Sequence, residues 1–152
     1  MRREDKEITE QYELDEIIKK AQVCRLAVSY RDMPYIVPLS FGYADGVLYF
    51  HSAPEGLKLL ILRENPQACF EVEVDTRVVS GKLGCDWTMQ YQSVIGFGEI
   101  QFIEDFQEKQ QALLLIMGQY TDQEVLLNDE TVSKVTLFKL NINTMTGKRS
   151  GY

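Results

Sequence analysis

The sequence predicts a mainly β protein with peripheral helices, folded as a closed or nearly closed antiparallel barrel. About six segments have the composition of strands, and short turns join most of them. The chain lacks regular strand–helix alternation and any Gly-x-Gly-x-x-Gly stretch, which disfavours a dinucleotide-binding fold. Its 152 residues, 45% of them hydrophobic, are expected to form a single domain, residues 1–152, around a substantial core.

The first half of the chain is predicted to contain two helices and three strands. A helix over 13–21 follows from apolar residues at positions i, i+3, i+4 and i+7, namely Leu14, Ile17, Ile18 and Ala21. Strands are expected at 23–30, 35–41 and 47–51, with a turn over 42–46 that contains Asp45-Gly46 and a short helix over 57–64 after Gly56. Pro38 cannot donate to a strand ladder, so it predicts an edge strand or a bulge.

The second half is predicted to contain three further strands and a long helix. The strands are expected at 68–76, 91–103 and 135–142, the helix at 105–120, and surface connections at 77–90 and 121–134. Gly96 and Gly98 lie on one face of their strand, which indicates a sharp bend or a close approach of another backbone. Residues 1–8 are charged and expected to be loosely held, and the last residues are either a functional tail or a frayed end.

Charge and cysteine content exclude several classes of protein. The formal charge of −7 argues against general nucleic-acid binding, which needs a basic face. No stretch is long and apolar enough to span a bilayer, and no apolar segment follows the charged N-terminus, so a cytoplasmic location is expected. Cys24, Cys69 and Cys85 are widely spaced and the chain has one histidine, which predicts reduced thiols and no zinc site.

His51 and Lys58 are the first candidate site residues. His51 ends a predicted strand and shares a face with Val47 and Tyr49, where it either contacts a ligand or is satisfied by a backbone carbonyl. Lys58 begins a helix just after Gly56, and amides at a helix N-terminus together with a lysine make an anion site. The alternative for Lys58 is a solvated surface lysine.

Three further segments carry candidate binding residues. Tyr91, Gln92 and Ser93 offer hydroxyl and amide groups, or else begin a strand with polar residues facing outward. Trp87 is expected at an interface. The chain has no nucleophile elbow, phosphate-binding loop or metal-ligand spacing, so any catalytic chemistry would belong to a cofactor.

Four stretches in register resemble one known family. They are P-L-S-F-G-Y-A-D-G-V-L-Y-F-H-S-A-P-E-G-L-K-L, N-P-Q-A-C-F-E-V, C-D-W-T-M-Q-Y-Q-S-V-I-G-F-G and M-T-G-K-R-S-G. Together they resemble the pyridoxamine 5'-phosphate oxidase-like family, and within it the flavin-binding split-barrel proteins related to the 5-nitroimidazole resistance reductases. This resemblance implies a six-stranded antiparallel split β-barrel that forms a homodimer, with FMN bound at the dimer interface.

The resemblance also implies roles for individual residues. Pro38, Leu39, Ser40 and Phe41 would line the isoalloxazine ring, and His51, Ser52 and Lys58 would lie along the ribityl and phosphate side. Tyr91, Gln92 and Ser93 would form a second wall, and Lys148 and Arg149 would reach in from the tail. His51 is the one catalytic candidate, because the matching histidine of the nitroimidazole-resistance relatives lies close to the flavin.

The sequence departs from this family at the expected phosphate end. Many relatives have basic residues where Leu57, Gln90 and Gln92 stand, and each charge-assisted bond to a phosphate contributes roughly 1.5–3 kcal/mol. Weaker FMN binding or a different bound anion is therefore expected. The resemblance implies an FMN-dependent oxidoreductase acting on nitroaromatic or other small flat substrates. The alternatives are a flavin-nucleotide carrier without turnover, or a split barrel adapted to another cofactor such as haem.

Overall fold

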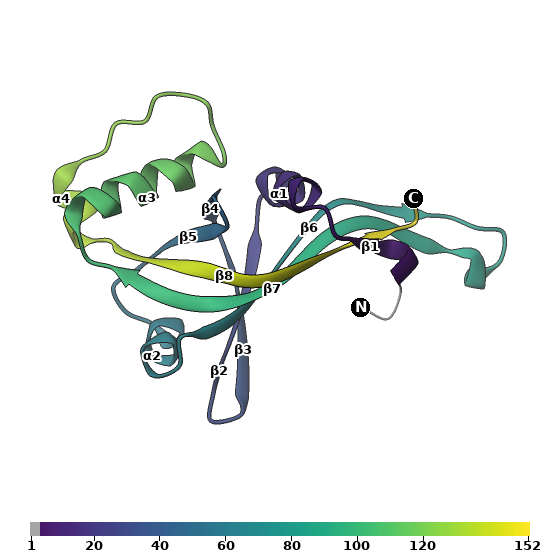
Figure 1. The fold of residues 1–152 in the computed structure, drawn as a ribbon, viewed down its shortest axis with the longest axis horizontal. Coiled ribbons are helices and arrows are strands. Elements are labelled where there is room, and N and C mark those ends of the chain that lie inside the picture. Colours follow the sequence, from purple (N-terminus) through teal and green to yellow (C-terminus); the bar gives the residue numbers. More distant parts are fainter. Residues whose placement is uncertain (1–3) are drawn as a thin grey trace.

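The computed structural model describes residues 4–152 as one strongly curved antiparallel sheet with helices at its periphery (Figure 1). The strands are β1 Glu7–Ile8, β2 Cys24–Tyr30, β3 Met33–Leu39, β4 Phe41–Ala44, β5 Val47–Ser52, β6 Gln67–Val79, β7 Thr88–Ile103 and β8 Thr136–Ser150. The helices are α1 Gln11–Lys20, α2 Leu57–Glu64, α3 Phe106–Gly118 and α4 Asp129–Lys134, with short 3-10 turns at Glu4–Lys6 and Gly84–Asp86.

The order of the strands makes the sheet a split barrel. Hydrogen bonding connects the strands in the order β3-β2-β6-β7-β8-β5-β4, and β1 pairs with β8 beside this path. Strands β3 and β4 therefore lie at the two ends of the path, yet only Ser40 separates them in the chain. The sheet must curl until its two edges meet at Ser40, and we call this place the seam.

The inside of the curved sheet forms the main core. Alternate residues of the strands point inward, and the largest fully buried side chains include Phe41, Phe50, Phe70 and Phe138. Helix α1 adds its apolar face of Leu14, Ile17 and Ile18, as its spacing predicted. A smaller cluster lies under α3 and contains Ile103, Ala112, Ile116 and Leu137.

Gly96 and Gly98 mark a close approach of neighbouring chain segments, as the sequence indicated. A Cβ atom on Gly96 would overlap the ring of Phe70. One on Gly98 would overlap the carbonyl oxygen of Asn141, next to the point where β7 and β8 shift register. Both positions therefore exclude any side chain, and the sheet can pack this closely only if they stay glycine.

Several boundaries agree with the sequence prediction. Helix α2 spans the predicted 57–64, and β3 lies at the edge of the sheet, as Pro38 indicated. The turn expected over 42–46 is only Asp45-Gly46, because Phe41–Ala44 pairs with β5 as a strand. Both turn residues have positive φ, 49° and 76°, which suits a tight hairpin.

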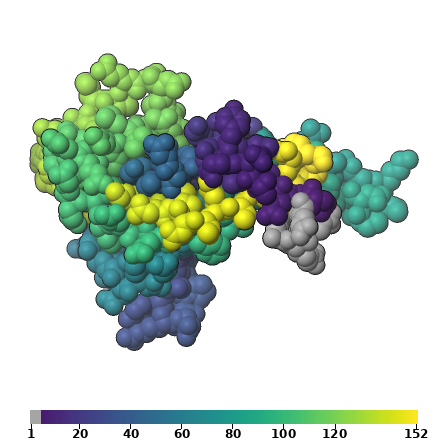
Figure 2. Space-filling model, in the orientation of Figure 1, coloured from purple at the N-terminus to yellow at the C-terminus, as the bar shows by residue number. Residues whose placement is uncertain are grey.

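Long-range pairing extends other strands beyond their predicted ends. Strands β6 and β7 take in residues expected in the 77–90 connection and form a projecting arm (Figures 1 and 2). The last residues are not frayed, because β8 pairs with β7 as far as Ser150 and with β1 at Lys148. Residues 4–8 are likewise ordered against β8, while residues 1–3 lie outside the described part of the chain. Among the described residues, no helix has the length and apolar character needed to cross a membrane.

Candidate functional site

The seam brings two of the predicted site segments together. Phe41 pairs with Phe50 in an antiparallel ladder, so Ser40 and His51 follow on the same side of that pair and lie opposite each other. The side chains of Ser40 and His51 are exposed, whereas Phe41 and Phe50 point into the core. Of the four residues predicted along a flavin ring, Pro38 and Ser40 are exposed and Leu39 is half-buried. Phe41 is fully buried, so it can offer a ligand only its backbone.

Ser52 has the clearest unmet hydrogen-bonding capacity in the described chain. It is 7% exposed, and its Oγ atom has no partner among the described residues. It follows Leu48 and Phe50 on the inner face of β5, the side on which Leu59 and Leu62 of α2 join the same core. A buried hydroxyl without a partner is costly unless a ligand or water satisfies it.

The N-terminus of α2 adds anion-binding groups to the same end of the barrel. Gly56 precedes the helix with a φ of 142°, and the first turn has no acidic residue. The amides of Leu57 and Lys58 have no carbonyl partner in the described part of the chain, as is usual at a helix start. Free amides at a helix start and a lysine ammonium are the kinds of donor that bind phosphate groups in proteins.

His51 and Lys58 keep their polar groups available. Neither side chain makes a hydrogen bond or ion pair with another residue of 4–152. His51 lies on the outward face of β5 and Ser52 on the inward face, so the two do not converge on one point. The structure therefore places His51 beside Ser40 on the outward side and the Ser52 side chain on the inward side, and the roles predicted for them toward a flavin stay predictions.

The other predicted binding residues lie at the opposite end of the sheet and divide between its two faces. Tyr91, Ser93 and Lys148 share the outer face, where the Lys148 ammonium donates to the Tyr91 hydroxyl at 2.6 Å and lies 5.2 Å from the centre of its ring. Gln92 and Arg149 point the other way, toward α1. The structure thus separates residues that the sequence prediction grouped together.

Gln92 and Arg149 are engaged in a polar network under α1. The Gln92 amide donates to the Asp75 carboxylate at 3.0 Å, and Arg149 forms an ion pair with Glu13 at 2.5 Å. Lys20 also pairs with Asp75, whose positive φ of 57° coincides with the register shift between β6 and β7. These residues border a cavity of about 470 Å³ between α1 and the sheet.

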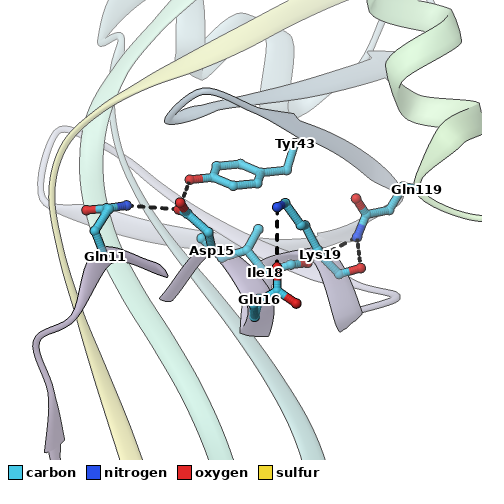
Figure 3. A network of polar contacts seen from close by, with 7 residues as sticks. All are labelled: Gln11, Asp15, Glu16, Ile18, Lys19, Tyr43 and Gln119. Carbon is cyan, nitrogen blue, oxygen red and sulfur yellow. Dashed lines mark hydrogen bonds and ion pairs between the residues drawn. The ribbon is translucent and has the colours of Figure 1, made fainter. Parts of the chain in front are cut away.

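Helix α1 is fixed to the barrel by a second polar network, drawn in Figure 3. The Tyr43 hydroxyl donates to Asp15 at 2.5 Å, and Gln11 donates to the same carboxylate at 2.8 Å. Burial, followed by the hydrogen bond to Asp15, raises the pKa of Tyr43 well above its usual value. Gln119, just beyond α3, donates to carbonyl groups at the end of α1, so α1 is tied to both β4 and α3.

The two predicted halves of the site are far apart within one chain. His51 pairs with Leu137 of β8, and Ser93 pairs with Lys148 of the same strand. Eleven residues separate Leu137 from Lys148, which is about 35 Å along a strand. Figure 1 shows the same separation: β4 and β5 lie over the body of the barrel, while the C-terminus lies at the base of the arm.

An apolar outer face lies between these two ends. Ile36, Phe97 and Ile95 are 61%, 58% and 44% exposed. Cross-strand pairing sets Ile36 beside Ala27, Ala27 beside Cys69, and Cys69 beside Phe97, so these side chains form one continuous row. The sequence reasoning missed this surface, although the apolar residues on both faces of 91–103 were a signal for it.

Charged residues border the apolar row. Arg25 donates to Glu71 at 2.9 Å and to Glu73 at 3.1 Å, which accounts for an arginine within a strand.

The three thiols differ in their surroundings: Cys24 is buried, Cys69 is half-buried on the outer face, and Cys85 is exposed on the arm. Burial raises the pKa of the Cys24 and Cys69 thiols, so neither is suited to act as a nucleophile.

A strongly curved antiparallel sheet whose two edges meet at Ser40 defines the class of split-barrel proteins. The family model described as pyridoxamine 5'-phosphate oxidase matches residues 10–149, and the chain belongs to this family. No curated protein matches the chain. The resemblance found in the sequence is thus confirmed, as is the split-barrel fold.

Solved structures give the same fold. A candidate 5-nitroimidazole antibiotic resistance protein from Bacteroides thetaiotaomicron is 33% identical, with a TM-score of 0.84, over 94% of this chain and 86% of that one. An FAD- and haem-binding protein from Mycobacterium smegmatis is 20% identical, with a TM-score of 0.85, over 97% and 74%. An FAD-binding protein from Mesorhizobium loti is 23% identical, with a TM-score of 0.69, over 94% and 96%. The last two likenesses establish the fold alone.

Proposed function

We propose that the chain is an FMN-binding oxidoreductase whose cofactor lies between two copies of the chain. The observation that carries this proposal is the division of the site, with Ser40, His51 and Ser52 at one end and Tyr91 and Lys148 at the other. FMN is much shorter than the roughly 35 Å of strand between these ends. A two-fold related pair of chains would instead set the seam of one chain against the arm end of its partner.

The apolar outer face supports a second copy as the occupant of this surface. Ile36, Ile95 and Phe97 form an exposed apolar patch on the outer face of the sheet. Patches of this kind on soluble proteins mark interaction surfaces. The face also runs between the two half-sites, so covering it with a second copy would complete both sites at once.

The seam end supports a phosphate as the bound anion. The Ser52 hydroxyl and the amides of Leu57 and Lys58 are donors without protein partners in the described chain, and the Lys58 ammonium supplies a positive charge. The basic residues that relatives have are absent here. Leu57 is apolar and exposed, Gln90 donates to the Gly151 carbonyl, and Gln92 donates to Asp75. We therefore expect FMN binding that depends strongly on Lys58 and is weaker than a fully basic site would give.

The residues beside the seam support a substrate position next to the flavin ring. When bound, reduced FMN supplies a hydride or single electrons to an electron-poor partner. Pro38 and Ser40 present an exposed strand end for a flat ring, and His51 lies beside them with its imidazole free to orient a substrate. Small flat nitroaromatic compounds are the proposed substrate class, in line with the family branch and the 33% identical structure.

A second candidate function is flavin carriage without turnover. His51 has no hydrogen-bonded acid or base partner among the described residues, so the chain shows no assembled proton-transfer pair. The two candidate functions share the same cofactor site, and they differ only in whether the bound flavin goes on to reduce a substrate. They are separated by whether a reduced nicotinamide and a nitroaromatic compound are consumed together.

The decisive experiment is the visible spectrum of the freshly purified protein, followed by titration with FMN. Oxidised-flavin absorption, or quenching of added FMN fluorescence, supports the proposal. A colourless protein that does not quench FMN overturns both flavin functions, and a haem spectrum assigns the pocket to that cofactor. For a flavin-loaded protein, consumption of a reduced nicotinamide with a nitroaromatic compound identifies an oxidoreductase, and its absence identifies a carrier.

A further inference from the structure

The residues just after α3 tie together three segments that are distant in the sequence. The Gln119 side-chain amide donates to the carbonyl oxygens of Ile18, Lys19 and Ala21, at 3.0, 2.9 and 2.9 Å. Ile18 and Lys19 lie in the last turn of α1 and Ala21 is its C-cap, and the Ile18 carbonyl also accepts a hydrogen bond from the Ala21 amide. Gln119 therefore serves as a cap for α1, supplied from about a hundred residues away in the chain.

Tyr120 makes a bridge of a different kind. Its hydroxyl accepts a hydrogen bond from the Phe41 amide at 2.9 Å and donates one to the Gln22 carbonyl at 3.0 Å. Phe41 is the first residue of β4, directly after the seam. Tyr120 thus connects the end of α3, the segment between α1 and β2, and the backbone at the point where the two sheet edges meet.

The bond to the Phe41 amide fixes the peptide that Ser40 shares with Phe41. Strand pairing stops at Leu39 on one side and begins at Phe41 on the other, so Ser40 itself has no partner in the ladder. Because the peptide is planar and trans, aiming the Phe41 N–H at Tyr120 aims the Ser40 carbonyl in the opposite direction. One side-chain hydroxyl therefore sets the orientation of both backbone groups at the seam.

We propose that Tyr120 is a positioning residue that sets the Ser40–Phe41 peptide against the flavin ring and thereby tunes the affinity and midpoint potential of the flavin. This inference rests on the proposed function, because Pro38–Phe41 is the stretch predicted to line the ring. Tyr120 itself need not touch the flavin. Backbone dipoles held at fixed positions beside a cofactor alter the relative stability of its redox states.

The test compares Tyr120→Phe with Tyr43→Phe as a matched control. Both variants keep the aromatic ring and lose one hydroxyl that anchors part of the α1 region, but Tyr43 bonds Asp15 and leaves the Phe41 amide untouched. In the protein without flavin, we expect Tyr120→Phe to speed hydrogen exchange of the Phe41 amide by about fivefold or more. In the flavin-loaded protein, we expect it to weaken FMN binding by about fivefold and shift the midpoint potential, with neither change in Tyr43→Phe.

Gln119→Ala separates positioning from simple loss of α1 docking. It removes the α1 cap but leaves the Tyr120 hydroxyl on Phe41. If Gln119→Ala reproduces the flavin effects of Tyr120→Phe, or if Tyr120→Phe has the wild-type potential and affinity, the inference is overturned. A wild-type protein that binds no flavin overturns the proposed function and the flavin part of the inference. In that case, the effect of Tyr120→Phe on hydrogen exchange of the Phe41 amide still confirms or overturns the Tyr120 hydrogen bond.

Discussion

The two ends of the barrel differ in whether their polar side chains already have hydrogen-bonding or ion-pair partners. At the seam, the Ser52 hydroxyl, the His51 imidazole and the Lys58 ammonium have no partners among the described residues. At the arm end, Lys148 is bonded to Tyr91, Arg149 to Glu13, and Gln92 to Asp75. The seam offers unmet capacity for a ligand, while the arm end has already satisfied its own groups.

This difference indicates how binding free energy should be distributed between the two ends. A free donor at the seam gains a full interaction when a ligand arrives, apart from the cost of removing water. A donor at the arm end must first give up, or share, a bond that it already has. Substitutions at the seam should therefore cost more flavin affinity than substitutions at the arm end, and loss of the second copy should cost more than either.

Phe97→Glu should have the largest effect, because it places a charge in the apolar outer face that we propose is covered by a second copy. We expect a monomer in light scattering coupled to size exclusion, with FMN affinity reduced by more than about tenfold. Leu114→Glu is the matched control, since Leu114 is an exposed apolar residue of α3, away from this face. A Phe97→Glu protein that remains dimeric with normal FMN binding would remove the outer face from the interface.

Lys58→Ala and His51→Ala should separate binding from turnover at the seam. Loss of the Lys58 charge is expected to weaken FMN binding by about tenfold or more, with a smaller effect on turnover by saturated protein. His51→Ala should lower turnover more than FMN affinity, because we place its imidazole beside the substrate. Affinities come from fluorescence quenching and turnover from nitroaromatic reduction, with Lys19→Ala as an exposed-lysine control. Equal effects on both quantities in both variants would contradict this division of roles.

Ser52→Ala should stabilise the protein without FMN and weaken its binding of FMN. Removing an unpartnered buried hydroxyl should raise the free energy of unfolding of the empty protein by roughly 1 kcal/mol. The same change should weaken FMN binding by a few-fold, because the ligand loses a donor. Thermal or denaturant unfolding with and without FMN measures both effects. A variant that is less stable without FMN would show that the Ser52 hydroxyl is already satisfied in the folded chain.

Local patterns in the sequence were enough to predict most elements of the fold, while the binding roles of the seam residues stay predictions. The α1 face, the Asp45-Gly46 turn and the Gly56 start of α2 depend on residues close in the chain, and the structure contains each of them. The tail was harder to predict because its order depends on pairing with β7 and β1, which no local spacing encodes.

The separation of Tyr91 and Ser93 from Gln92, on opposite faces of β7, could be predicted from the sequence only in part. Alternation along a strand puts Tyr91 and Ser93 on one face and Gln92 on the other, so their separation was readable once the strand was assumed. The contacts of each face depend on the register of β6, which shifts near Asp75, and on the position of α1. The Tyr120 bridge joins residues 79 apart through a single hydroxyl, and no sequence pattern marks it.

Lys148→Met should have the smallest effect on FMN affinity of these substitutions. It tests whether the arm end contributes less to FMN binding than the seam. In one chain Lys148 already donates to Tyr91 and lies against its ring, so its loss removes a bond that competes with any contact to FMN. We expect FMN affinity to fall by no more than about threefold, with the dimer intact. Tyr91→Phe is the companion variant: it frees the Lys148 ammonium and should leave FMN affinity unchanged or slightly raised. A Lys148→Met loss as large as that of Lys58→Ala would mean that the arm end gives up its own contacts to the ligand, and the two ends would then contribute equally.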